Sequence, residues 1–201
     1  MSKSAGNFFL VRDAAAKYGY KAVRFFLLSS QYRSPINYTE DTLLQSKAAV
    51  ERLDNCLSNI GFAKKNAAGD FSNEEKECVA FLNEKKQAFI EAMEDDLNTA
   101  DAIGFLFEMT RAINTLTARN CSQEFIKNVE EIYVPLCELL GFGTEAESDD
   151  AAYIEEMIAL RAEAKKAKDY AKADAIRNEL KEEGIILEDT PQGVKWKRVQ
   201  S

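Results

Sequence analysis

The sequence of 201 residues contains no histidine, and its four cysteines are far apart, at Cys56, Cys78, Cys121 and Cys137. Zinc sites in proteins are built mainly from histidines and closely spaced cysteines, so we expect no metal site formed by this chain. Three of the four cysteines fall within apolar helical patterns. We therefore expect reduced thiols packed in a core rather than disulfides.

Long apolar runs are also absent. No stretch approaches the ~18 residues that a membrane-spanning helix needs, and the first residues do not have the pattern of a signal peptide. The chain is 46 % apolar and 30 % charged, as in ordinary globular proteins. We therefore expect a cytoplasmic protein with no membrane partner, with one main domain and a small second one.

The net charge of −8 is distributed unevenly along the chain. Residues 1–35 carry six Lys and Arg against one Asp, and residues 161–201 carry ten against eight acidic residues. The segment between them, 36–160, therefore holds a charge of −15. Two basic ends suit contact with a polyanion at separate places, because local patches steer binding more than net charge does. Blocks of charge are equally common on solvated surfaces, so charge alone leaves both interpretations open.

Apolar residues recur at helical spacing through most of the chain, which predicts a mainly α fold. A first helix should end near Lys17. Residues 21–30 are apolar almost all round, which predicts a buried second helix. Arg24 lies within this helix. Because a buried cation needs a partner, we expect Arg24 to pair with a carboxylate or with backbone carbonyls.

Four longer helices should follow, each with one apolar stripe. We expect them to begin near Thr39, Ser72, Asn98 and Ser122. The first of them should end at Gly61. Short connections and single stripes predict an antiparallel helical bundle. Asp95 and Asp96 precede the third of these helices; nothing nearby completes a set of metal ligands, so we expect them to serve the helix dipole and cap.

Residues 143–150 are small and acidic, which indicates a linker. Beyond it, the pattern predicts two helices, 151–168 and 170–183, and two short strands, 185–188 and 194–199, joined by a turn that contains Pro and Gly. These elements would form a small helix-plus-β-hairpin module. We thus expect three parts in the chain, at residues 1–36, 37–143 and 149–201.

Several short segments can be compared with known families. The first is Met1-Ser2-Lys3-Ser4-Ala5-Gly6-Asn7, and the others run from Lys21 to Ser29, from Asp95 to Ala100 and from Gly184 to Gly193. Together they resemble the class I aminoacyl-tRNA synthetases, and specifically the cysteinyl-tRNA synthetases, whose KMSKS loop is similar to the first segment with its first lysine missing. The resemblance implies the C-terminal portion of such an enzyme, with junction helices after the loop, a DALR-type anticodon-binding bundle and the terminal module.

The resemblance also implies roles in catalysis for the first residues. In the family, the loop binds ATP while the amino acid is activated, and a lysine that holds the departing phosphates lowers the barrier. This catalytic role falls to Lys3, with Ser2 and Ser4 as further ATP-binding residues and Gly6 giving the loop freedom to close. The implied cofactor is ATP with Mg, and zinc is expected only in the catalytic domain, which is missing from this sequence.

The implied partner is tRNA(Cys) rather than DNA, with its anticodon read by the terminal module. The resemblance implies tRNA-binding roles for Lys165, Tyr170, Asp174 and Asp189, and the basic residues around Trp196 on the predicted hairpin add Trp196 and Arg198 as tRNA-binding residues. Basic side chains would neutralise phosphates, aromatic rings would stack on bases, and carboxylates would accept from base edges. From the residues alone, a core position for Trp196 and a solvated face for the lysines is the alternative. For Arg24, contact with the inner corner of tRNA is the functional alternative.

These observations predict the tRNA-binding region of a cysteinyl-tRNA synthetase, which attaches cysteine to tRNA(Cys) with the use of ATP. ATP and cysteine would bind through the missing catalytic domain, so we expect the isolated chain to be inactive. A stand-alone, non-catalytic tRNA-binding protein is the alternative. A ligase that joins cysteine to a small amine is disfavoured, because such an enzyme would not need the terminal module.

Overall fold

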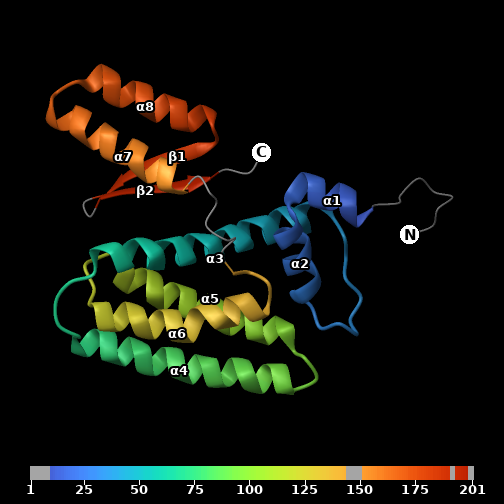
Figure 1. The fold of residues 1–201 in the computed structure, drawn as a ribbon. Coiled ribbons are helices and arrows are strands. Elements are labelled where there is room, and N and C mark those ends of the chain that lie inside the picture. The colour runs from blue at the N-terminus through green and yellow to red at the C-terminus, as the bar shows by residue number, and fades with distance from the viewer. Residues whose placement is uncertain (1–9, 144–150, 191–192, 199–201) are drawn as a thin grey trace. The chain divides into compact units, whose positions relative to one another are not determined.

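A computed structural model describes residues 10–143, 151–190 and 193–198. The chain divides into two compact units, Met1–Thr144 and Glu145–Ser201. The first unit is built from helices alone in its described part, and the second combines helices with a β-hairpin (Figure 1). The mainly α fold class is confirmed. In the first unit the helices are α1 (Val11–Tyr18), α2 (Tyr20–Leu28), α3 (Glu40–Asn66), α4 (Asn73–Glu94), α5 (Thr99–Thr117) and α6 (Gln123–Leu139).

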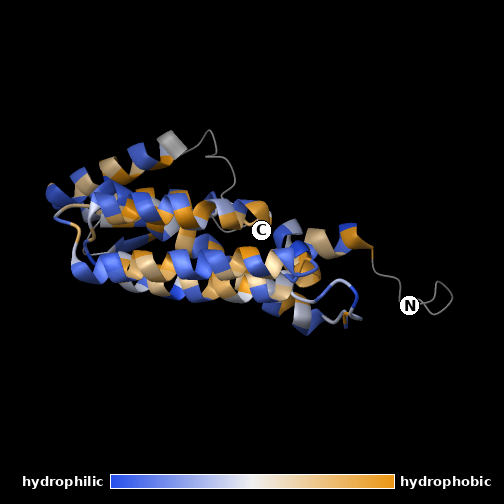
Figure 2. Ribbon diagram, turned by 90° about the horizontal axis from the view of Figure 1, so that it is seen from below, coloured by the Kyte–Doolittle hydropathy of each residue, from blue (hydrophilic) through white to orange (hydrophobic). Residues whose placement is uncertain are grey.

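Helices α3 to α6 form the predicted bundle, and local hydrogen bonds set where each helix begins. The side chains of the four N-cap residues accept bonds from backbone N–H groups of the first turn, at Thr39, Ser72, Asn98 and Ser122. Each bundle helix carries both hydrophobic and hydrophilic residues, and Figure 2 shows both kinds along the helical ribbons. The apolar ones meet in one core, whose fully buried members include Leu53, Leu82, Leu106 and Phe125. The prediction of four amphipathic helices is therefore confirmed.

Helix α3 does not end at Gly61, as we expected, but continues to Asn66. The added turn buries Ala63, which is 6 % exposed, against the bundle core. A glycine within a helix costs about 1 kcal/mol relative to alanine, which tertiary packing can offset. The prediction failed because it weighed the local preference of glycine without that packing.

Helices α1 and α2 share a smaller core with the start of α3. The helices are separated at Gly19, whose φ of 88° is open to glycine but costly for other residues. The smaller core contains Ala14, Tyr18, Ala22, Val23, Phe26 and Leu43. Because α2 buries one face against this core and the bundle, its other face is open to solvent, and Leu27 is 52 % exposed. The expectation of a helix buried all round was therefore wrong.

Arg24 lies on the open face of α2 and is exposed. Among the residues that the structure describes, no carboxylate or carbonyl pairs with it. Its guanidinium lies against Gly141, where an added Cβ would come within 2.5 Å of one terminal nitrogen. The predicted burial and pairing of Arg24 were wrong, because the helix turns this position away from the core.

Asp96 is held by residues that precede α3 rather than by the helix that it was expected to cap. The Tyr32 hydroxyl donates to Asp96 Oδ1 at 2.8 Å, and the Arg33 guanidinium lies 3.3 Å from Oδ2. The cap of α5 is Asn98, whose side chain accepts from the Asp101 N–H at 3.2 Å. Asp96 and Leu97 both have positive φ, at 52° and 55°. The expected capping role of Asp96 was therefore wrong.

The second unit contains α7 (Ala151–Lys166), α8 (Tyr170–Glu182), β1 (Ile185–Thr190) and β2 (Gly193–Arg198). The two strands pair in antiparallel register, with Leu187 opposite Trp196. Alternate residues of β1 point to the helices, so the helices and the hairpin enclose a core of Ile154, Ile176, Leu180, Ile185 and Leu187. The predicted helix-plus-β-hairpin module is confirmed.

The sequence also raised expectations about the cysteines, about metal sites and about membrane-spanning helices. All four cysteines are free thiols, and Cys56, Cys121 and Cys137 are buried. Within the described ranges, no group of three or more His, Cys, Asp or Glu side chains could hold a metal ion. A search of the same ranges finds no helix that combines the length and the apolar character of a membrane span.

Candidate nucleic-acid interface

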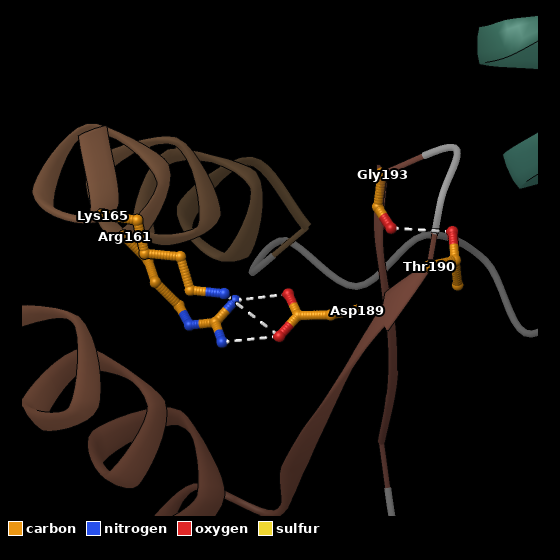
Figure 3. A network of polar contacts seen from close by, with 5 residues as sticks. All are labelled: Arg161, Lys165, Asp189, Thr190 and Gly193. Atoms are coloured by element: carbon orange, nitrogen blue, oxygen red, sulfur yellow. Dashed lines mark hydrogen bonds and ion pairs between the residues drawn. The ribbon is translucent and has the colours of Figure 1, made fainter. Parts of the chain in front are cut away.

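The terminal module brings together two of the predicted site residues, Lys165 and Asp189, and a third residue, Arg161, also binds Asp189 (Figure 3). Arg161 and Lys165 lie one turn apart on α7, and Asp189 lies near the end of β1. The two terminal nitrogens of Arg161 donate to the two oxygens of Asp189, at 2.8 and 2.9 Å. Lys165 Nζ donates to Asp189 Oδ2 at 3.1 Å. The arrangement is a bidentate fork with a second cation beside it.

The two partners of the fork differ in how far they are buried. The side chain of Arg161 is 5 % exposed, whereas that of Asp189 is 52 % exposed. Hydrogen bonds from Arg161 hold the pKa of the Asp189 carboxyl well below its ordinary range, although burial alone would raise it. The same bonds raise the pKa of Arg161. Asp189 is therefore a fixed carboxylate at the surface of the module, ionised at neutral pH.

The remaining predicted side chains of the helices lie at the surface. Tyr170, the first residue of α8, is 64 % exposed. Asp174, one turn further along α8, is exposed, and its charge contributes to raising the pKa of Arg161. Further exposed lysines lie at the end of α7, in the turn that follows it and in the first turn of α8, at positions 166, 168 and 172. Cations, an exposed ring and carboxylates thus occur together on these two helices.

Trp196 is placed differently from the other predicted residues. It packs against the core of the module from its position opposite Leu187. Its indole N–H donates to Glu155 Oε1 at 3.5 Å, and the residue is half-buried. The sequence left a core position and a base-stacking surface open for Trp196. In the isolated unit, the ring contributes to the core and keeps part of its surface open to solvent.

Four of the predicted site residues cannot be placed by their side chains. Ser2, Lys3 and Ser4 lie outside the described residues. The backbone of Arg198 pairs opposite Ile185, but its side chain lies outside the described part. Their roles in ATP and tRNA binding stay predictions.

Arg161 is the one member of the network that our reading of the sequence overlooked. It falls at helical spacing after Ile154 and Ile158, two residues that pack on the module core, and it is itself 4 % exposed. An arginine at an apolar position of a helix needs an anionic partner. The spacing of Arg161 therefore indicates a buried ion pair at this position, whereas such a pair was predicted for Arg24.

The arrangement suits recognition of an unpaired base better than bond-making chemistry. The lysines can neutralise phosphates, and Tyr170 offers an open ring for stacking. Asp189, held rigidly, offers acceptor oxygens for the N–H donors of a base edge. A carboxylate with a lowered pKa is a poor general base at neutral pH, so the network is not arranged for proton transfer.

Comparison with known proteins identifies both ends of the first unit. Residues 1–48 match the family model described as the catalytic domain of class I (C) tRNA synthetases, and residues 88–144 match that of the DALR domain. The cysteine–tRNA ligase of Caldicellulosiruptor saccharolyticus is 44 % identical over 203 residues, which include 100 % of this chain and 43 % of the relative. That of Lachnoclostridium phytofermentans is 46 % identical, over 98 % of this chain and 44 % of the relative. The cysteine–tRNA ligase of Clostridioides difficile is 43 % identical, over 99 % of this chain and 43 % of the relative.

The chain thus spans less than half the length of the curated relatives that it matches. The matching region of those relatives is their C-terminal part. The similarity includes the terminal module as well as the bundle, because the aligned regions cover 98 to 100 % of the chain. Over its whole length, this chain is homologous to the C-terminal part of cysteine–tRNA ligases.

Proposed function

We propose that this chain is the tRNA-binding part of a cysteine–tRNA ligase, an enzyme of the cytoplasm that attaches cysteine to tRNA(Cys) with the use of ATP. The relatives are named for this activity. Cysteine and ATP would bind to a nucleotide-binding domain that is not part of this sequence. The part described by the structure would contribute binding and positioning of tRNA.

The observation that carries this proposal is the network of Arg161, Lys165 and Asp189. A buried guanidinium fixes the orientation of a carboxylate that is itself half exposed. A fixed acceptor of this kind selects base edges that present donors, such as N1–H and N2–H of guanine. The anticodon of tRNA(Cys), GCA, begins with guanine.

Neighbouring side chains would complete the surface. Tyr170, exposed at the start of α8, would stack on an anticodon base, a contact worth ~1–3 kcal/mol per base. Asp174 offers a second acceptor on α8, and Lys165 offers a cation for the backbone. Trp196 and Arg198, from β2, would extend the surface along the hairpin. Anticodon recognition would therefore use both helices and the hairpin.

For the loop at the N-terminal end, the resemblance is the basis of the proposal. Lys3 would hold the phosphates that leave ATP, with Ser2 and Ser4 as loop ligands and Mg on the nucleotide. Zinc, if the enzyme uses it for the thiol of cysteine, would be held outside the described residues, which offer no suitable cluster. A single lysine does not activate an amino acid, so the purified chain should show no cysteine-dependent pyrophosphate exchange.

Binding of labelled tRNA to the purified chain tests the anticodon part of the proposal. Fluorescence anisotropy would compare tRNA(Cys) carrying GCA with the same transcript carrying a changed first anticodon base. We expect tighter binding of the GCA transcript, with affinity that falls as salt rises because phosphates are neutralised. Equal affinity for both transcripts would overturn anticodon recognition by this chain.

Variants locate the binding surface within the chain. Asp174→Asn should reduce the preference for GCA, and Lys165→Ala should weaken binding of both transcripts. Lys127→Ala is the matched control, because it removes an exposed lysine from α6, in the other unit. The emission of Trp196, the one tryptophan of the chain, checks that each variant module is folded.

A further inference from the structure

The first unit contains a hollow between the end of α2 and the start of α3. Its volume is about 420 Å³, and ten residues line it, none of them charged. Phe25, Phe26 and Ile36 supply apolar walls. Ser30 and Asn37, from the segment between α2 and α3, and Gln45, from the second turn of α3, add polar groups. This size falls within the usual range for small-molecule sites, roughly 300–1,000 Å³.

Hydrogen bonds within the protein account for only some of the polar lining. Ser29 Oγ donates to the Phe26 carbonyl at 2.9 Å, and Ser46 Oγ donates to the Thr42 carbonyl at 2.7 Å. Thr42 belongs to the capping box of α3. By contrast, the side chains of Ser30, Asn37 and Gln45 have no hydrogen-bond partner among the described residues. Asn37 and Gln45 are exposed and Ser30 is half-buried, so in the free protein these two amides and the hydroxyl line the hollow where it is open to solvent.

The chemistry of this lining defines the ligand class. The absence of a cation from the lining argues against a phosphate or a carboxylate inside the hollow. Apolar walls with a few convergent polar groups suit a flat, uncharged ring that carries donors and acceptors along one edge. Asn and Gln present a donor beside an acceptor, the pattern that pairs with the N6 and N7 edge of adenine.

We propose that this hollow binds an unpaired nucleobase, with adenine preferred. Asn37 and Gln45 would read the edge of the base, while the phenylalanine and isoleucine walls would contact its faces. The proposal does not depend on anticodon recognition, which concerns the second unit. Because the free nucleoside carries the base without phosphates, the site can be tested without RNA.

The experiment is a titration of the labelled 201-residue chain with adenosine, guanosine, cytidine and uridine, followed by NMR. We expect adenosine to shift the side-chain amide signals of Asn37 and Gln45 saturably and at lower concentration than the other three nucleosides. In an Asn37→Ala/Gln45→Ala variant, followed by the backbone amides of the hollow, the affinity for adenosine should fall about tenfold or more.

Two further variants keep the test decisive. Asn83→Ala/Gln87→Ala removes the same residue types from exposed positions of α4 and should leave adenosine binding unchanged. Ser30→Phe keeps both amides but fills the hollow, and it should abolish the shifts. The proposal is overturned by equal affinity for all four nucleosides, by undiminished binding in the Asn37→Ala/Gln45→Ala variant, or by the absence of shifts up to the solubility limit of adenosine.

Discussion

Replacing Asp189 by Asn should selectively destabilise the terminal module. The change keeps the shape of the side chain and one acceptor oxygen but removes the negative charge that faces Arg161. The guanidinium would stay in place, because the Arg161 side chain is 5 % exposed and its Nε–H is buried without a partner among the described residues. The buried guanidinium would then lack the carboxylate that binds it. Removing one partner of a buried ion pair is destabilising, because it leaves the other charge buried and uncompensated.

The size of the effect follows from the exposure of the two partners. Breaking a fully buried pair costs about 3–5 kcal/mol, but Asp189 is 52 % exposed, so water reduces the loss. Hydrogen bonds to charged groups contribute about 1.5–3 kcal/mol, and we expect a loss near 2 kcal/mol. A unit of roughly 60 residues has a total stability of about 3–9 kcal/mol. The substitution should therefore remove a large fraction of the stability of the module.

Fluorescence of Trp196 makes the assay specific for this unit. It is the only tryptophan of the chain and packs on the module core, so its emission should shift to the red when the module unfolds. With a urea dependence of about 1 kcal/mol per molar, the midpoint should fall by about 2 M. The helical signal of the bundle, followed by circular dichroism, should keep its own midpoint.

Glu188→Gln is the matched control for Asp189→Asn. It removes one negative charge from the neighbouring position of the same strand, where the side chain is exposed and lies opposite Lys195 in the ladder. Surface pairs of this kind contribute at most about 1 kcal/mol. The reasoning is refuted if the two variants have the same midpoint, because the buried fork would then contribute no more than an exposed charge.

Three further predictions concern stability. Because the pKa of Asp189 is lowered in the folded module, its charge stabilises the module above the ordinary Asp pKa of about 3.9 and ceases to do so as pH falls through the folded value. The urea midpoint of Trp196 emission should consequently fall on acidification below about pH 4, and more steeply in the wild type than in Asp189→Asn. Glu75 is 5 % exposed and accepts from the N–H groups of Ser72 and Ser122, both at 2.7 Å. Glu75→Ala should cost about 2–3 kcal/mol in thermal unfolding followed by circular dichroism, whereas Glu77→Ala, at an exposed position of the same helix, should cost little. Gly141→Ala should cost about 1–2 kcal/mol for its φ of 76°, and the contact with Arg24 should add little, because the end of that exposed side chain can move away. A clearly smaller cost in an Arg24→Ala background would contradict this expectation.

The boundaries of the helices could be predicted because the signals that set them are local. Ser72 and Glu75 form a capping box within one turn, and Asp169 caps α8 through a bond from the Lys172 N–H. Such contacts are visible in four consecutive residues. The end of α3 was predicted wrongly because the packing of Ala63, and not the preference of Gly61, decides where that helix stops.

The candidate site shows where reading the sequence fails and why. Arg24 and Arg161 both lie in helices with many apolar neighbours, yet only Arg161 is buried. The two arginines differ in their position around the helix relative to the apolar stripe. The number of apolar neighbours in the sequence does not reveal that position. Asp189 lies 28 residues from its partner Arg161, and Tyr32 lies 64 residues from its partner Asp96. Local sequence patterns could therefore not predict either pair.

The hydrogen bonds of Asp189 restrict how it could read a base. A carboxylate offers about four lone-pair positions, of which Arg161 occupies two and Lys165 one. A base edge with two donors needs two positions, so one of the cations must withdraw. The Lys165 contact is exposed, and such pairs contribute at most about 1 kcal/mol, whereas the Arg161 side chain of the fork is only 5 % exposed. Lys165 is therefore the cation that should leave Asp189 when a base binds, which would free its ammonium for a phosphate of the same RNA strand.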